Sequence, residues 1–170
     1  HGYGNALSVM RTVEELETAG VSGLSIEDTD LPQPYGLGDK QRMLSLEEGV
    51  RKMKAAVAAR RDPDLVIAGR TSAPQIAGIE EAIRRAKAYA ATGVDAIFLV
   101  GISSRAELEA VAAAKIGKPL ILGNTPGDLA DKAYLGSKGV RIALQGHQQF
   151  AAAVQGIYTT LKALRDGVKP

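Results

Sequence analysis

Helix-like and strand-like segments alternate along this chain of 170 residues, and that alternation constrains the fold more than any other feature. Over residues 5–19, the apolar positions Leu7, Met10, Val13 and Leu16 recur at helical spacing, and Gly20 is suited to end that helix. Helices are predicted over residues 5–19, 45–60, 78–91, 105–114, 129–135 and 148–164, and strands over 22–27, 65–69, 95–100, 119–122 and 140–144. The pattern is therefore one helix followed by a run of βα units.

The strands are short, hydrophobic and mostly without alternation, which is typical of a parallel sheet buried on both faces. Two α/β architectures fit, a (β/α)8 barrel and a doubly wound sheet. A barrel typically needs about 250 residues, whereas a flavodoxin-like sheet would be complete at this length. The opening helix, preceded only by residues 1–4, favours a barrel whose first strands are not in this chain. No composition break divides residues 1–170, which indicates one domain.

Composition narrows the functional classes. The 21 Lys and Arg residues nearly balance the 19 Asp and Glu residues, which argues against a nucleic-acid partner. The longest apolar runs, such as residues 96–100, fall far short of the roughly 20 residues that a membrane span needs. The chain has no cysteine, which excludes disulfides, thiolate zinc sites and a cysteine nucleophile, and fits a reducing, cytoplasmic location.

Polar side chains follow the predicted strands, where ligands bind in either architecture. Glu27 and Asp28 follow the first strand, Arg70 the second, Asn124 the fourth and His147 the fifth. An acid, a guanidinium, an amide and an imidazole are thus expected on one rim. This set suits a divalent cation with oxygen ligands and a substrate that carries a carboxylate.

Each of these residues also has a structural interpretation. Glu27 and Asp28 can be a solvated strand end, and Arg70 can simply pair with Glu27. His147 can cap the last helix, and Asn124, followed by Thr-Pro-Gly, fits a turn. The functional hypothesis rests on their convergence rather than on any one of them.

Residues 29–44 form a long connection without a clear period, here called the 29–44 segment. Such connections are commonly lids or binding loops. Tyr35 and Arg42 could reach over a ligand. The residues that oppose helix formation are Pro32, Pro34, Gly36 and Gly38.

Several motifs together resemble the phosphoenolpyruvate mutase/isocitrate lyase superfamily, most closely its oxaloacetate decarboxylase branch. They are HGYGN at residues 1–5, IEDT at 26–29, AGRT at 68–71 and QGH at 145–147. The resemblance implies a (β/α)8 TIM barrel, of which this chain carries the last five βα units. It also implies Mg2+, with Mn2+ possible, and a homotetramer in which helix 148–164 is swapped onto a neighbouring subunit.

The resemblance also assigns roles to individual residues. Glu27 matches an acidic residue that reaches the metal through water, and the main Asp ligands would precede His1. Arg70 matches the arginine that holds a substrate carboxylate. His147 matches a catalytic histidine of the decarboxylase branch, and Asn124 a substrate-binding asparagine of the lyase branch. Gly2 and Tyr3 are expected to contribute to substrate binding.

The implied reaction is decarboxylation of a small 2-oxo dicarboxylate, from oxaloacetate to pyruvate and CO2. The 29–44 segment lacks the cysteine of the isocitrate-type lyase lid and the Lys-Thr-Asn pattern of the mutase lid. The alternatives are another C–C or C–P bond enzyme acting on a 2-oxo or 2-hydroxy acid, a non-catalytic paralogue that binds a small acid, and a flavodoxin-like binding module.

Overall fold

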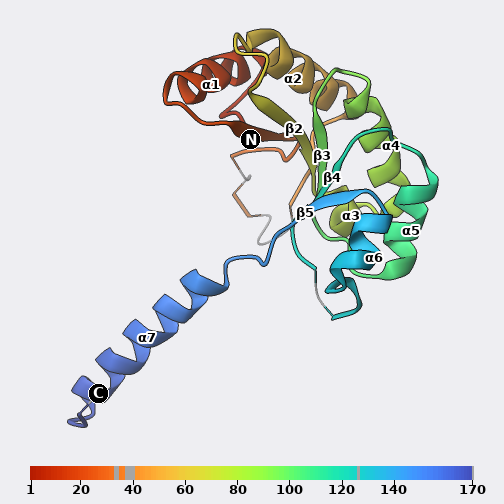
Figure 1. Ribbon diagram of the computed structural model, residues 1–170. Helices are drawn as coiled ribbons and strands as arrows, with labels where there is room; N and C mark the ends of the chain where they lie inside the picture. The colour runs from red at the N-terminus through yellow and green to blue at the C-terminus, as the bar shows by residue number, and fades with distance from the viewer. Residues whose placement is uncertain (33–34, 37–40, 126, 170) are drawn as a thin grey trace.

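The computed structural model describes residues 1–32, 35–36, 41–125 and 127–169, and it confirms the alternation of helices and strands (Figure 1). The helices are α1 (Ala6–Thr18), α2 (Leu46–Ala59), α3 (Ala73–Ile76), α4 (Ile79–Ala90), α5 (Arg105–Ala113), α6 (Lys132–Ser137) and α7 (Gln148–Arg165), with a 3-10 turn η1 (Gly127–Leu129). The strands are β1 (Gly23–Glu27), β2 (Val66–Thr71), β3 (Ala96–Leu99), β4 (Leu120–Leu122) and β5 (Val140–Ala143).

Local hydrogen bonds explain where the first long helices begin. The Asn5 side chain accepts hydrogen bonds from the amides of Leu7 and Ser8 and so caps α1. Ser45 and Glu48 form the reciprocal capping box at the start of α2, since each side chain accepts from the other residue's amide at 3.2 Å. Both starts follow from side chains a few positions away in sequence.

The five strands form one parallel sheet in the order β1-β2-β3-β4-β5. Every strand therefore lies beside the next one in sequence, as in a (β/α) barrel, whereas a doubly wound sheet reverses its strand order at a switch point. The flavodoxin-like alternative is therefore wrong. Helices α1, α2, α4, α5 and α6 lie along one face of this arc of strands (Figure 1).

The main hydrophobic core lies between the sheet and these helices and includes Ile26, Ile67, Ile97 and Leu122. The opposite face of the sheet carries a smaller cluster of Ala68, Ala96 and Phe98. Strand register places Glu27 beside Arg70, and Arg70 beside Phe98. One row across this second face therefore brings together the carboxylate and the guanidinium expected at the site.

Three local features differ from the sequence prediction. The short helix α3 and the turn η1 were not predicted. Helix α6 begins at Lys132 rather than at residue 129, because the Asp131 side chain accepts hydrogen bonds from the amides of Ala133 and Tyr134. In addition, the strand ends differ from the prediction by up to two residues, since β2 runs to Thr71 and therefore contains Arg70.

Helix α7 confirms the predicted last helix but leaves the body of the molecule (Figure 1). None of its 18 residues is buried. Across the described part of the chain, no helix combines the length and the apolar character that a membrane crossing requires.

Candidate active site

The Glu27 carboxylate is the centre of the candidate site. Glu27 ends β1 and is only 3% exposed, which excludes the solvated strand end considered from the sequence. Its Oε1 accepts a hydrogen bond from the Ser72 hydroxyl at 2.6 Å. Its Oε2 lies 3.0 Å from Arg70 Nε and 3.4 Å from Nε2 of the His1 imidazole. The buried carboxylate is thus surrounded by side chains from two separate segments, residues 70–72 and the chain before α1.

Arg70 extends from β2 along the second face of the sheet. Its Nε is close to Glu27 Oε2 but lacks hydrogen-bond alignment with any described residue. Its guanidinium carbon lies 4.7 Å from the centre of the Phe98 ring, a cation–π arrangement. The side chain remains 34% exposed, and no described residue forms a hydrogen bond with its terminal nitrogens. The guanidinium is therefore held on one side and open to an anionic ligand on the other.

Asp28, next to Glu27, belongs to a separate buried cluster. It is fully buried, and its Oδ2 accepts hydrogen bonds from Arg85 at 2.8 Å and from the Tyr89 hydroxyl at 2.5 Å, both on α4. Burial and the negative charge of Asp28 raise the pKa of Tyr89. Burial alone would lower the pKa of Arg85, because it disfavours the charged guanidinium. The hydrogen bonds that Arg85 makes to Asp28 and Glu81 have the larger effect, so the pKa of Arg85 is raised. Within the Asp28–Arg85–Tyr89 cluster, these shifts keep Arg85 charged and Tyr89 neutral.

The same cluster holds both ends of the 29–44 segment. Arg85 donates to the carbonyl of Leu44 at 2.9 Å, and the Leu44 amide donates to the carbonyl of Asp28 at 2.8 Å. Thr29 and Met43 form a β-bridge at the same place. The base of the segment is thus closed beside Glu27. Tyr35 is fully exposed, and the predicted helix-opposing residues Pro34 and Gly38 lie outside the described residues.

The structure brings Glu27 and Arg70 together but does not join His147 or Asn124 to them. His147 is exposed at the start of α7, where its side chain makes no capping hydrogen bond. The side chain of Asn124 accepts from the amide of Thr125 at 3.0 Å, as its turn interpretation predicts. Within the described residues, no hydrogen bond or ion pair connects either side chain to Glu27 or Arg70. Their expected roles stay predictions.

Gly2 and Tyr3 lie in the turn before α1, with Gly2 buried and Tyr3 91% exposed. The segment that contains them also supplies the His1 imidazole next to Glu27. Their expected contact with substrate stays a prediction.

Sequence reasoning missed three contributors to the site: Ser72, Lys52 and the His1 imidazole. Ser72 follows Arg70 by two positions, but a serine at a strand end has no distinctive signal. Lys52 does have a recognisable signal in the sequence, because it is a charged residue on the buried face of α2, beside Gly49, Met53 and Ala56. A cation on the buried side of an amphipathic helix indicates a specific polar partner inside.

A divalent cation fits the donor atoms at the end of β1. Mg2+ prefers carboxylate oxygens, and Glu27 supplies one carboxylate there, whereas the Asp28 carboxylate belongs to the separate cluster with Arg85 and Tyr89. Asp28 Oδ1 is buried and has no hydrogen-bond partner among the described residues. Those residues contain no group of three or more metal-ligating side chains, so an ion held by Glu27 would need further ligands.

The sequence pattern of the phosphoenolpyruvate phosphomutase family matches residues 1–165 of this chain. An oxaloacetate decarboxylase of Bradyrhizobium diazoefficiens is 60% identical over all 170 residues, and one of Rhodopseudomonas palustris is 55% identical. In both comparisons the chain spans 58% of the relative's length.

Solved structures with the same arrangement include an oxaloacetate acetylhydrolase bound to the inhibitor 3,3-difluorooxalacetate. It has a TM-score of 0.82 and 34% identity, and the match covers 98% of this chain and 58% of that one. A phosphonopyruvate hydrolase in complex with oxalate and Mg2+ has a TM-score of 0.80 and 32% identity, covering 98% and 59% of the two chains.

Proposed function

The chain belongs to the phosphoenolpyruvate phosphomutase family, and from this premise we propose that it is part of a divalent-metal-dependent oxaloacetate decarboxylase that releases pyruvate and CO2. The proposed substrate rests on one observation: the chain is 60% identical, over all 170 residues, to an oxaloacetate decarboxylase. The open guanidinium of Arg70 beside the buried Glu27 supplies a site for a small dicarboxylate.

In the proposed reaction, the bond between C3 and C4 of oxaloacetate breaks and C4 leaves as CO2. The bonding electrons form an enolate, and a proton added at C3 gives pyruvate. A bound divalent cation supplies stabilisation of the negative charge that develops on the 2-oxo oxygen. The chain's own residues bind and orient the substrate.

Arg70 would bind a substrate carboxylate through its terminal nitrogens, since bidentate contacts suit the planar guanidinium. Phe98 beneath the guanidinium and Glu27 at its Nε fix its direction. Glu27 would hold the divalent cation, which is Mg2+ in this proposal, with Mn2+ as a substitute. Ser72 fixes the Glu27 carboxylate through its hydrogen bond. His147 is proposed to supply the proton or to orient the departing carboxylate.

The test is pyruvate release by the full-length protein from oxaloacetate with Mg2+, with phosphonopyruvate and 2,3-dimethylmalate assayed in parallel. Because metal ions alone decarboxylate oxaloacetate slowly, the reference reactions contain Mg2+ without protein and Mg2+ with an Arg70→Ala variant. We expect turnover of oxaloacetate above both references. Turnover of only phosphonopyruvate or dimethylmalate would assign another reaction of the family, and binding without turnover would indicate a non-catalytic paralogue.

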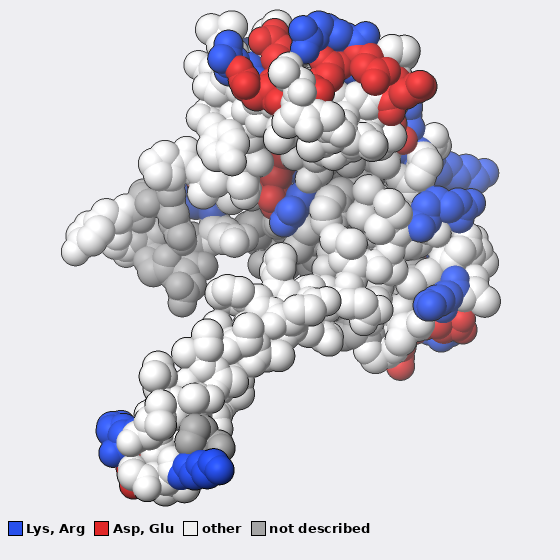
Figure 2. All heavy atoms as spheres, turned by 60° about the vertical axis from the view of Figure 1, so that its left-hand side comes forward, with Lys and Arg blue, Asp and Glu red and all other residues white. Residues whose placement is uncertain are grey.

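We further propose that the protein is a homotetramer in which α7 packs on a neighbouring copy. Phe150, Ile157 and Leu161 of α7 are 72%, 62% and 61% exposed, and exposed apolar surface of this extent marks interaction sites. Figure 2 shows α7 free of charged side chains along most of its length, with Lys and Arg near its tip. The cytoplasmic location expected from the sequence stays a prediction.

Light scattering on the full-length protein tests this assembly. Ile157→Asp combined with Leu161→Asp should reduce the mass of the assembly, because two charges would enter an apolar interface. Gln155→Asp, on the opposite side of the helix, is the matched control and should leave the mass unchanged. An unchanged mass for the double variant would contradict packing through this face.

A further inference from the structure

The turn before α1 has an unfavourable backbone conformation. Gly2, Tyr3 and Gly4 have φ values of 73°, 55° and 149°, so three successive residues lie in the left-handed half of φ space. Glycine adopts such values readily, but Tyr3 does so at a cost. Gly2 is also confined, because a Cβ there would lie 2.4 Å from Cγ2 of Val9. A strained turn of this kind persists only where surrounding contacts hold it.

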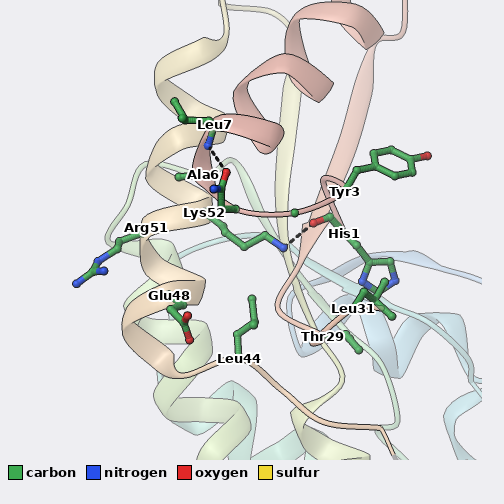
Figure 3. Close-up of a pocket in the computed structure, with 12 residues that line it drawn as sticks. His1, Tyr3, Ala6, Leu7, Thr29, Leu31, Leu44, Glu48, Arg51 and Lys52 are labelled. Atoms are coloured by element: carbon green, nitrogen blue, oxygen red, sulfur yellow. Dashed lines mark hydrogen bonds between the residues drawn. The ribbon is translucent and has the colours of Figure 1, made fainter. Parts of the chain in front are cut away.

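Lys52 is the side chain that holds the start of this turn. It extends from α2 across a cavity of about 480 Å³ that lies between α1, α2 and the base of the 29–44 segment (Figure 3). Its ammonium donates to the carbonyl of His1 at 2.5 Å and to the carbonyl of Glu27 at 3.2 Å. One cation therefore connects the turn with the end of β1.

Burial makes this arrangement costly. Lys52 is 4% exposed, and burial lowers its pKa, while the nearby charges of Asp28 and Glu27 act in the opposite direction. Its neighbours on the same stripe, Met53 and Ala56, are fully buried and apolar. A methionine would fill position 52 without the cost of desolvating a charge. The lysine therefore has to be explained by what its ammonium binds.

Both acceptors of Lys52 belong to residues whose side chains meet. The imidazole of His1 lies 3.4 Å from Oε2 of Glu27, and the carbonyls of the same two residues share the Lys52 ammonium. Movement of either main chain would change the distance between imidazole and carboxylate. Lys52 makes no described hydrogen bond to a carboxylate, so its hydrogen bonds act on the site through the main chain of His1 and Glu27.

We propose that Lys52 is a positioning residue that fixes the His1–Gly4 turn against the end of β1 and thereby places the His1 imidazole and the Glu27 carboxylate for binding of a divalent cation. The inference rests on the proposed role of Glu27 as a metal-binding residue. It adds a residue on α2 that does not touch the cation or the substrate.

The experiment measures Mn2+ affinity of the full-length protein by electron paramagnetic resonance, together with kcat and KM for oxaloacetate. Lys52→Met should weaken Mn2+ binding by roughly tenfold, the usual effect of removing a group that orients a metal ligand. At saturating metal, kcat should fall while KM changes little, because Arg70 is left in place. Lys52→Arg should recover part of the affinity, since its guanidinium can still donate to both carbonyls.

Lys54→Met is the matched control, because Lys54 is on the same helix and exposed. It should bind Mn2+ as the unaltered protein does. If Lys52→Met does not fold, Lys52→Arg is compared with Lys54→Arg, and a weaker affinity in the first alone supports the inference. Unaltered affinity in a folded Lys52→Met variant, or equal losses at both positions, would overturn it.

The two proposals can fail separately. If the full-length protein releases no pyruvate from oxaloacetate but Lys52→Met still weakens Mn2+ binding, the substrate is wrong and the positioning role stands. If the protein decarboxylates oxaloacetate and Lys52→Met leaves Mn2+ affinity and kcat intact, the positioning role is wrong and the function stands.

Discussion

Replacement of Arg85 by methionine is expected to destabilise the protein strongly, although Arg85 lies outside the candidate site. Its guanidinium donates to Asp28 Oδ2 at 2.8 Å, to the Leu44 carbonyl at 2.9 Å and to Glu81 Oε1 at 2.6 Å. The Arg85 side chain is 6% exposed and that of Asp28 is 0% exposed. Among the described residues, the substitution would therefore leave Tyr89 as the one side chain that donates a hydrogen bond to this fully buried carboxylate.

The size of the effect follows from this burial. Removing one member of a buried ion pair typically costs about 3–5 kcal/mol, because the other charge is left uncompensated. Methionine retains most of the apolar contacts of the arginine stem, so the loss reports chiefly on the charge and its hydrogen bonds. We expect the free energy of unfolding to fall by about 4 kcal/mol. Closure of the 29–44 segment at Leu44 should weaken as well.

Urea unfolding followed by circular dichroism measures this loss. Arg84→Met is the matched control, because Arg84 is the preceding residue on α4 and also pairs with Glu81, but its side chain is 59% exposed. Exposed ion pairs contribute little, so this variant should unfold close to the unaltered protein. Equal losses for the two variants would refute the reasoning, since burial of the Asp28 partner would then have no energetic consequence.

The remaining predictions concern the site, the packing of α2 and pH. Arg70→Ala should lower kcat/KM for oxaloacetate by roughly 30- to 1,000-fold, about 2–4 kcal/mol of lost carboxylate binding, and Arg70→Lys should recover only part of it. Gly49→Ala should cost about 1–3 kcal/mol of stability, because its Cβ would lie 2.3 Å from the Tyr89 hydroxyl, whereas Gly136→Ala, with open space around it, should be tolerated. Hydrogen bonds from Arg84 lower the pKa of Glu81 below its ordinary value of 4.5. The ionised Glu81 therefore contributes stability above pH 4.5, and this contribution is lost as the pH falls through the lowered pKa. Glu81→Gln should consequently make the free energy of unfolding depend less on pH in the acid range.

Each of these three predictions would be contradicted by a specific experimental result. Arg70→Ala with unchanged kcat/KM would remove Arg70 from substrate binding. A Gly49→Ala variant as stable as the Gly136→Ala variant would show that the helix can move away from Tyr89. Parallel acid unfolding curves for Glu81→Gln and the unaltered protein would contradict the lowered pKa of Glu81.

Local features of the fold were predictable because they depend on contiguous residues. The capping box of Ser45 and Glu48 spans four positions, and the helical spacing of Leu7, Met10, Val13 and Leu16 is visible in a single segment. The strand ends were placed to within two residues, so Glu27 and Arg70 were found as candidates, although Arg70 lies inside β2 rather than after it. The start of α6 was misplaced because the Asp131 cap competes with an equally plausible start at Leu129.

Contacts between distant segments could not be predicted in the same way. Lys52 and Ser72 reach Glu27 from separate elements, and nothing in the local sequence specifies these partners. Asp28 was grouped with Glu27 as a rim carboxylate, but the structure buries it against Arg85, 57 residues further along the chain. Glu27 is the last residue of β1 and Asp28 is the next residue in the chain, and adjacent residues in extended backbone point to opposite sides. Glu27 therefore lies at the site, whereas Asp28 contacts Arg85 and Tyr89 of α4.

The amino-acid sequence by itself determined the kinds and order of the elements and the residue types at the ends of the strands, because periodicity and capping act over a few positions. Only the tertiary structure decided that the strands lie in sequential order, and that Glu27, Arg70 and Phe98 form one row. Strand register is set by hydrogen bonds and packing between segments that are tens of residues apart in sequence. The free energy of these contacts depends on all the strands and helices that pack together, so no single segment specifies it.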